Sequence, residues 1–318
     1  MVGKHSFVAV QKSDKIFVAG HRGLVGSAVV RRLEQDGFAH IVTRTRGELD
    51  LRNAASVAQF FAAEKPAFVI LAAAKVGGIK ANNDSPVEFL LENLEMQNNV
   101  VRAAYETGVQ KLLFLGSSCI YPRMAPQPIP ESALLSGPLE PTNEGYAIAK
   151  IAGIKLCQAY AREYGANFIS AMPTNLYGPN DNFDLLSSHV AAALLHKAHI
   201  AKLENARELV VWGSGRPRRE FLHVDDLAAA CVFLLEKYDS PEVINVGCGE
   251  DISISELAGL ICEVVGFKGE LAWDTTKPDG TPRKLLDVSK IHALGWRHQI
   301  GFREGLRRTY EWFLENKR

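Results

Sequence analysis

Short apolar runs alternate with longer helical patterns through the first half of this 318-residue chain. Runs of strand length cover 15–19, 41–43, 68–71, 111–115 and 168–172, and helical patterns cover 24–35, 54–64, 86–107 and 145–164. Strands that are apolar throughout and separated by helices are typical of a parallel sheet covered on both faces. The sequence therefore predicts an α/β fold with a doubly wound parallel sheet.

A glycine-rich turn joins the first predicted strand to the first predicted helix. It reads Gly20-His21-Arg22-Gly23-Leu24-Val25-Gly26. Glycines at this junction let the backbone approach a pyrophosphate, and the helix N-terminus offers free N–H groups and partial positive charge. Strand, turn and helix occur in the required order, which predicts a Rossmann-type dinucleotide site rather than a purely structural turn.

Two arginines follow the second predicted strand, at Arg44 and Arg46. An acidic residue there would hold the ribose 2′-hydroxyl of NAD, whereas arginine suits the 2′-phosphate of NADP. The sequence thus favours NADP(H), unless the arginines are only solvated. By analogy with the fold, we expect Asp50 and Leu51 near the adenine.

Three further residues indicate carbonyl–alcohol redox chemistry. Tyr146 and Lys150 stand four positions apart, and Ser117 precedes Tyr146 by 29 positions. Residues i and i+4 share one helix face, so the phenol and the ammonium lie on the same side. A free phenol has a pKa of about 10, and a nearby lysine lowers it. A Tyr-x-x-x-Lys pair can also occur by chance, so the other motifs must support this interpretation.

Beyond residue 177 the pattern is less regular, with helices near 187–199 and 225–237, a turn at 212–215 and a strand at 244–246 that can rejoin the main sheet. We expect Asp225 or Asp226 to cap the helix near 225–237. The predicted division is an N-terminal extension at 1–14, an NADP-binding Rossmann domain at 15–177 joined by about 221–247, and a smaller C-terminal α/β lobe, mainly for substrate, at 178–318.

Composition argues against several other classes of protein. The net charge of zero disfavours nucleic acid or an anionic membrane as the main partner. No apolar run reaches the roughly 18 residues of a membrane span, and the N-terminus lacks a secretory pattern. The five cysteines show neither disulfide-framework nor zinc spacing. We therefore expect a cytoplasmic protein without a metal.

The ordered motifs resemble those of the extended short-chain dehydrogenase/reductase superfamily, and more closely the GDP-L-fucose synthase family within it. The resemblance is carried by residues 19–23, 72–79, 115–122, 172–179, 219–226 and 277–284. It implies a substrate, GDP-4-keto-6-deoxy-D-mannose, that is epimerised at carbons 3 and 5 and then reduced at carbon 4 by NADPH. It also implies a homodimer formed by the helices at 86–107 and 145–164.

The resemblance assigns a role to each candidate site residue. Cys119 and His189 would be the base and acid of epimerisation, since thiols and imidazoles, with pKa values near ~8.5 and ~6.5, exchange protons near neutrality. Tyr146 would protonate the carbonyl oxygen, Ser117 would hydrogen-bond it, and Lys150 would bind the nicotinamide ribose. The implied cofactor residues are 20–26, Arg46, Asp50, Leu51, Leu115, Gly116, Ser117, Ser118, Tyr146, Lys150, Pro173, Thr174, Asn175, Leu176 and His189. The implied substrate residues are Lys197, Trp212, Arg219, Asp279 and Lys284.

Taken without the resemblance, the same residues have plainer interpretations. Cys119 is a small buried residue, His189 is a polar helix residue, and the substrate candidates are solvated charges or a packed aromatic. A nucleotide-sugar 4-epimerase or dehydratase, and a non-enzymatic NADP-sensing protein, are the competing hypotheses. The 4-epimerase and the dehydratase are disfavoured by the arginines after the second strand and by Cys119-Ile120-Tyr121 after the serines. The non-enzymatic protein is disfavoured because Ser117, Tyr146 and Lys150 are all present.

Overall fold

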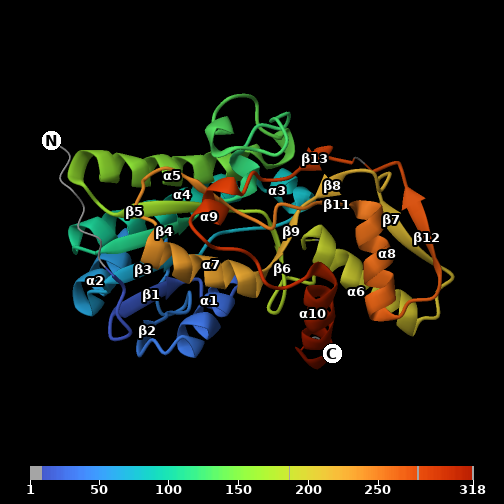
Figure 1. Cartoon of the computed structure of the whole chain (residues 1–318), viewed down its shortest axis with the longest axis horizontal. Helices are drawn as coiled ribbons and strands as arrows, with labels where there is room; N and C mark the ends of the chain where they lie inside the picture. Colours follow the sequence, from blue (N-terminus) through green and yellow to red (C-terminus); the bar gives the residue numbers. More distant parts are fainter. Residues whose placement is uncertain (1–8, 186, 278, 317–318) are drawn as a thin grey trace.

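A computed structural model describes residues 9–185, 187–277 and 279–316 (Figure 1). Residues 1–8 of the predicted N-terminal extension lie outside this described part. The main sheet has the strand order β10-β5-β4-β3-β1-β2, and every neighbouring pair runs parallel. Its strands are β1 (Lys15–Ala19), β2 (His40–Val42), β3 (Phe68–Leu71), β4 (Lys111–Leu115), β5 (Phe168–Pro173) and β10 (Ile244–Val246).

Helices cover both faces of this sheet. On one face α2 packs on α4, and α4 packs on α5; on the other, α1 packs on α7 (Figure 1). Their bounds are α1 (Leu24–Gln35), α2 (Ala54–Glu64), α4 (Pro86–Glu106), α5 (Glu144–Tyr164) and α7 (Val224–Lys237). All residues of β3, β4 and β5 are buried, as strands covered on both faces require. The predicted doubly wound parallel sheet is confirmed.

Close packing of α4 on α5 fixes the helix that carries Tyr146 and Lys150. The side chain of Gln97 on α4 donates from Nε2 to the carbonyl oxygen of Ala149 at 2.6 Å. A Cβ added to Gly153 would lie 2.5 Å from the ring of Phe114. Glycine therefore lets α5 approach the sheet and α4 together, which holds its first turns in one position.

The sheet has a switch point between β1 and β3. The chain leaves β1 through α1 towards β2, and leaves β3 through α4 towards β4 on the other side. At such a point the connections separate beyond the carboxyl ends of the strands, and ligands of open α/β sheets bind there. The glycine turn that follows β1 lies at this position.

The C-terminal lobe has a hydrophobic core of its own, to which α6, α8, α10, β7 and the aromatic Tyr177 contribute. Strands β7 and β12 pair in parallel, β8 pairs with β11 and β13, and β6 pairs with β9. The helices of this lobe are α6 (Val190–Leu203), α8 (Ile254–Val265) and α10 (Phe302–Asn316), whereas α3 (Ile79–Asp84) and α9 (Ser289–Ala293) pack beside α4 and β10 of the main domain. The strands are β6 (Asn175–Tyr177), β7 (Glu208–Trp212), β8 (Arg218–Arg219), β9 (Phe221–His223), β11 (Ile252–Ser253), β12 (Glu270–Asp274) and β13 (Arg283–Lys284).

The start of α7 differs from the prediction. The N-cap is His223, whose side chain accepts a hydrogen bond from the backbone of Asp225, so the predicted aspartate cap is wrong. Asp225 instead pairs with Arg31 of α1 at 2.7 Å. Asp226 accepts hydrogen bonds from the backbone N–H groups of residues 299 and 300. Both carboxylates thus tie α7 to its neighbours.

Among the described residues, no helix combines the length and apolar character needed to cross a membrane.

Candidate active site

The turn after β1 can accept a dinucleotide. Gly20 has φ +89°, and a Cβ there would lie 2.7 Å from the backbone nitrogen of Ala73. A Cβ on Gly26 would lie 2.1 Å from the carbonyl oxygen of Gly20. Gly23 is the N-cap of α1, and it has no side chain to occupy the free N–H groups of the first turn. The backbone therefore passes close to β3 and leaves an anion site at the helix N-terminus, as a pyrophosphate requires.

The two arginines after β2 are in different situations. Arg44 pairs with Glu64 at 2.5 Å and lies over the ring of Phe60. The side chain of Arg46 is 68% exposed, and its nearest carboxylate, on Glu92, lies at 3.8 Å. Arg46 is therefore the more available of the two for a ribose phosphate.

Asp50 already has a partner within the protein. Its carboxylate accepts hydrogen bonds from the guanidinium of Arg52, which lower its pKa to about 2 despite partial desolvation. Leu51, beside it, is buried. A contact of Asp50 and Leu51 with the adenine stays a prediction.

Other predicted cofactor residues lie at the ends of neighbouring strands. Leu115 ends β4, and a Cβ on Gly116 would lie 2.5 Å from the sulfur of Met172 on β5. The segment from Pro173 to Leu176 continues from β5 into β6. Thr174 donates its N–H to the carbonyl of residue 246 at 3.0 Å, which fixes the loop to β10. Parallel strands end at one edge, so these residues share the edge of the sheet with the glycine turn.

Tyr146 and Lys150 lie in the first two turns of α5, close to the end of β4. The Lys150 ammonium donates a hydrogen bond to the carbonyl oxygen of Leu115 at 2.9 Å and lies 5.9 Å from the centre of the Tyr146 ring. The Tyr146 phenol lies near the hydroxyl of Ser117, which acts to lower the pKa of the phenol. The structure thus brings the three predicted residues together.

The pKa of Tyr146 differs from the prediction. Burial and the nearby Cys119 raise the pKa of Tyr146, and the hydroxyl of Ser117 opposes this only in part. The predicted lowering by Lys150 is wrong for this structure, because desolvation dominates and the ammonium bonds to a backbone carbonyl instead. The phenol therefore stays protonated at neutral pH, which suits a proton donor.

Lys150 is nearly inaccessible, with 3% of its surface exposed, and burial lowers its pKa from 10.5 to about 8. A lysine whose pKa is depressed by folding is destabilising when charged. The penalty is absent above the unfolded pKa, grows as the pH falls, and is complete below the folded pKa. The difference corresponds to roughly 3 kcal/mol at neutral pH.

We expect Lys150→Met to stabilise the cofactor-free protein at pH 7 by roughly 2 kcal/mol, after about 1 kcal/mol for the lost hydrogen bond is subtracted. The gain should shrink as the pH rises towards 10.5. Urea unfolding of both proteins at pH 7 and pH 10 measures it. A variant that is less stable than the parent at pH 7 would contradict the burial penalty.

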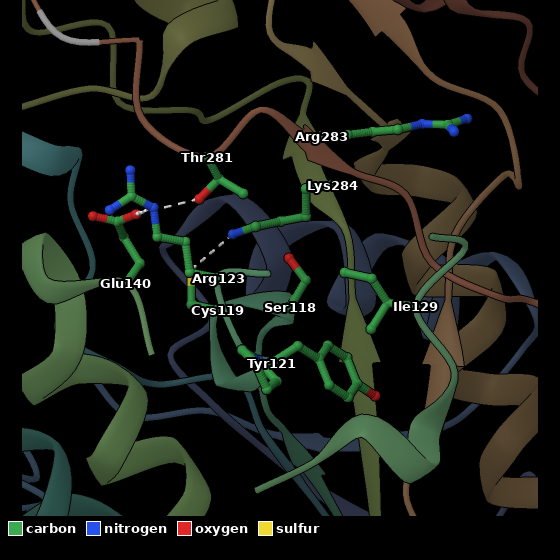
Figure 2. Close-up of a pocket in the computed structure, with 10 residues that line it drawn as sticks. Ser118, Cys119, Tyr121, Arg123, Ile129, Glu140, Thr281, Arg283 and Lys284 are labelled. Carbon is green, nitrogen blue, oxygen red and sulfur yellow. Dashed lines mark hydrogen bonds and ion pairs between the residues drawn. The ribbon is translucent and has the colours of Figure 1, made fainter. Parts of the chain in front are cut away.

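Cys119 lies in a short 3-10 helix (Ser118–Ile120) directly after Ser117, whose hydroxyl accepts a hydrogen bond from the Cys119 backbone. Its Sγ accepts from Nδ2 of Asn143 at 3.3 Å and from Nζ of Lys284 at 3.7 Å. Figure 2 shows the Lys284 side chain directed at the sulfur. Asn143 was missed by sequence reasoning, although its position three residues before Tyr146 was a usable signal.

A small pocket lies beside Cys119, between the loop that follows β4 and strand β13 (Figure 2). Its lining includes Cys119, Glu140, Thr281 and Lys284. Glu140 accepts a hydrogen bond from the Thr281 hydroxyl at 3.4 Å and pairs with Arg123 at 3.3 Å. The Thr281–Glu140 contact joins the two lobes next to the thiol, and sequence reasoning did not anticipate it.

His189 is the N-cap of α6 rather than a residue within the predicted helix. The segment before it is fixed by Gly78, whose N–H donates to the carbonyl of Ser187 at 2.9 Å. A Cβ on Gly78 would lie 2.7 Å from the carbonyl oxygen of Ser188. His189 is open to solvent on one side but surrounded by protein on the others, and this burial together with the charge of Lys284 lowers its pKa.

The predicted substrate residues fall into two groups. Trp212, which is 51% exposed, has the ammonium of Lys197 at 4.8 Å from its ring centre. The turn after Trp212 is held by Asp279, which accepts from the N–H and hydroxyl of Ser214 at 2.7 and 2.8 Å. Lys197, Trp212 and Asp279 therefore occupy one region of the C-terminal lobe.

Arg219 and Lys284 form the second group. They are paired in register across β8 and β13. Burial lowers the pKa of Arg219, while nearby Cys119 and Asp279 favour its charged form. Lys284 thus lies at the thiol instead of with Trp212.

Glu220 is a further residue that sequence reasoning missed. It is fully buried, and its carboxylate accepts from the N–H groups of Gly249 and Leu286 at 2.7 and 3.0 Å. Burial raises its pKa against these hydrogen bonds. Glu220 holds the segment after β13 against β8 and β10, which positions Lys284.

Among the described residues, no group of three or more histidine, cysteine, aspartate or glutamate side chains is placed to hold a metal.

The fold and the site define a class: a Rossmann-type oxidoreductase with a Ser–Tyr–Lys centre at the carboxyl edge of a parallel sheet. A family model described as the NAD dependent epimerase/dehydratase family matches residues 16–247. The chain belongs to this family and, by its identity to relatives over nearly the whole length, to the GDP-L-fucose synthases within it.

Three comparisons illustrate the similarity. "Putative GDP-L-fucose synthase 2" of Arabidopsis thaliana is 65% identical over 307 residues, which cover 96% of this chain and 94% of that protein. "GDP-L-fucose synthase" of Escherichia coli (strain K12) is 56% identical over 313 residues, covering 96% and 98%. The crystal structure of a GDP-L-fucose synthetase from Naegleria fowleri bound to NADP has a TM-score of 0.90 and 33% identity, covering 98% and 97%.

Proposed function

We propose that the protein converts GDP-4-keto-6-deoxy-D-mannose into GDP-L-fucose, by epimerisation at carbons 3 and 5 followed by NADPH-dependent reduction at carbon 4. The observation that carries this proposal is a thiol and a phenol in one site, with Cys119 and Tyr146 both next to Ser117. Relatives named GDP-L-fucose synthase, similar along almost the whole chain, support it.

A ketone at carbon 4 makes both reactions feasible in one pocket. It acidifies the protons on carbons 3 and 5, so that a base can remove each one and an acid can return it to the other face. The same carbonyl then accepts a hydride. Groups that hold its oxygen therefore serve both steps, and Tyr146 and Ser117 are placed beside each other for this task.

The residues at the edge of the sheet suit NADPH, which supplies the hydride when it is bound. Residues 20–26 would hold the pyrophosphate, and Arg46 the 2′-phosphate. Lys150 would bind the nicotinamide ribose. The segments 115–118 and 173–176 would flank the nicotinamide, since they lie at the ends of the neighbouring strands β4 and β5. The NADP-bound neighbour from Naegleria fowleri supports this cofactor.

The proton transfers are assigned to the remaining groups. Cys119 is the base and His189 the acid of epimerisation, and the lowered pKa of His189 makes its protonated form the stronger proton donor. Tyr146, protonated because it is buried, donates the proton to the oxygen during reduction.

The GDP moiety is assigned to the C-terminal lobe. Trp212 offers an exposed ring for the base, with Lys197 beside it. Arg219 is a donor for the diphosphate, and Asp279 lies where it can meet sugar or base hydroxyl and amino groups. Lys284 is a second candidate for the diphosphate.

Incubation with GDP-4-keto-6-deoxy-D-mannose and NADPH tests the function. We expect stoichiometric NADPH oxidation and a product that NMR identifies as GDP-L-fucose. Incubation in deuterium oxide without NADPH should label carbons 3 and 5. Reduction without inversion at these carbons would leave a 4-keto reductase and overturn the epimerase half of the proposal.

We further propose a homodimer formed by α4 and α5, in the cytoplasm. Val87, Leu91 and Tyr105 share one side of α4 and are exposed, as is Ile148 on α5. Apolar residues at this spacing favour a partner helix face. All five cysteines are free, which supports a reducing compartment.

Leu91→Lys should convert the dimer into a monomer, because it places a charge in the apolar contact. Analytical ultracentrifugation measures the change, and circular dichroism checks that the fold is kept. Leu203→Lys, which adds the same charge at an exposed leucine of α6, is the matched control. A parent protein that sediments as a monomer would contradict the dimer.

A further inference from the structure

We propose that Lys284 and Asn143 are positioning residues that hold the sulfur of Cys119 as a thiolate, ready to remove a proton. The inference rests on the proposed function, in which Cys119 is the base. It gives Lys284 a partner other than the diphosphate and gives Asn143 a role in the reaction.

Two donors from distant parts of the chain converge on one sulfur. Nδ2 of Asn143, at the start of α5, lies 3.3 Å from Sγ of Cys119, and Nζ of Lys284, on β13, lies 3.7 Å from it (Figure 2). An ammonium has donors and no acceptor, so its contact favours a negatively charged sulfur. A thiolate is the form of cysteine that acts as a base or nucleophile.

The Asn143 side chain is available to the sulfur because it makes few other hydrogen bonds. Its side chain does not cap α5, and its Oδ1 is buried with no hydrogen-bond partner among the described residues. Rotation of the amide would offer this oxygen to a protonated thiol. Asn143 can therefore accompany Cys119 through both protonation states of a catalytic cycle.

Lys284 is held at the sulfur by its backbone. Its strand pairs with β8 in a fixed register. The next residue, Leu285, donates its N–H to the side chain of Gln127 at 2.9 Å, and Leu286 donates to Glu220 at 3.0 Å. The strand is therefore fastened to the loop that follows Cys119, and the Lys284 side chain extends from this fixed base to Sγ.

The charged groups around the thiol favour an anion. Lys284 of β13 and Arg219 of β8 are the cations next to Cys119, and Tyr146 of α5 is neutral when protonated. His189 also lies near Lys284. The acidic groups in the surroundings, Glu140 and Asp279, lie next to Arg219, which offsets part of their charge.

The proton transfer balances with these groups alone. The thiolate takes a proton from carbon 3 or 5, the electron pair of the broken C–H bond moves to the carbonyl oxygen as an enolate, and Cys119 becomes a thiol. Lys284 exchanges no proton with the substrate in this step. Lys284 therefore acts on the fraction of Cys119 that is present as the thiolate.

Site-specific alkylation by iodoacetamide, followed by mass spectrometry across a range of pH, tests the proposal on the full-length protein. We expect Lys284→Met to slow alkylation of Cys119 about tenfold at pH 7, because the sulfur loses the cation that favours its anionic form. Lys284→Arg should restore most of the rate. Asn143→Ala should slow alkylation by a smaller factor of about three.

Lys268→Met, which removes an exposed lysine of the same lobe, is the matched control and should leave the profile unchanged. Thermal unfolding checks that each variant is folded. An unchanged Cys119 profile in Lys284→Met would overturn the proposal, even if turnover fell, because Lys284 would then act on the substrate. Alkylation is measured without substrate, so a failure of this proposal can be distinguished from a failure of the proposed function.

Discussion

Tyr146→Phe should lower the rate of carbonyl reduction by about 10²- to 10⁴-fold, the usual contribution of a general acid. Burial keeps the Tyr146 phenol protonated, and Phe keeps the ring packing while removing the donor. Stopped-flow oxidation of NADPH with the keto-sugar measures the rate, and fluorescence titration measures NADPH affinity. We expect the affinity to change little, because the pyrophosphate and ribose sites lie on other residues.

Tyr238→Phe is the control for this prediction. It removes another largely buried phenol, one that donates to the carbonyl of residue 242 and lies outside the proposed site. The Tyr238→Phe variant should catalyse carbonyl reduction at the rate of the parent protein. If Tyr146→Phe also turned over near that rate, another group would have to supply the proton, and the Ser117–Tyr146 pair would be only structural.

Cys119→Ser is expected to reduce solvent-deuterium exchange into carbons 3 and 5 by at least about 10²-fold. A serine hydroxyl is far less acidic than a thiol, so it cannot supply the anion that we propose for the sulfur that Lys284 and Asn143 contact. Reduction of the carbonyl should persist in part, since Ser117, Tyr146 and Lys150 are untouched. NMR of the sugar protons and absorbance of NADPH separate the two activities.

Cys262→Ser provides the comparison, because Cys262 is a half-buried thiol of α8, away from the loop that follows β4. It should exchange like the parent. Unchanged exchange in Cys119→Ser would remove the thiol from the base assignment. In that case the alkylation rate of Cys119, with or without Lys284, would not bear on epimerisation.

The main sheet could be predicted because each strand carries its own signal. The helix predicted at 86–107 is α4 at Pro86–Glu106, and the strand predicted at 244–246 is β10 beside β5. Short runs of four to six mostly apolar residues between helical patterns of matching length are typical of strands covered on both faces. Local sequence patterns are therefore sufficient to predict the strands and helices of the main sheet.

The site was predictable in its motifs but less so in its contacts. Ser117, Tyr146 and Lys150 meet because one strand end and one helix carry them. The partnership of Lys284 with Cys119 depends on the register of β13 against β8, between strands of two residues each, which no periodicity reveals. The pKa of Tyr146 also needed the structure, because desolvation is a property of packing.

The contact between Cys119 and Lys284 has a consequence for how the chain acquires its two abilities during folding. It joins residues 165 positions apart, whereas the glycine turn meets Ala73 within the first quarter of the chain. Contacts across a long loop cost more chain entropy and form later than local ones. We therefore expect a folding chain to form the glycine turn against Ala73 before Lys284 reaches the sulfur of Cys119, so that the nucleotide site precedes the proton-abstracting site.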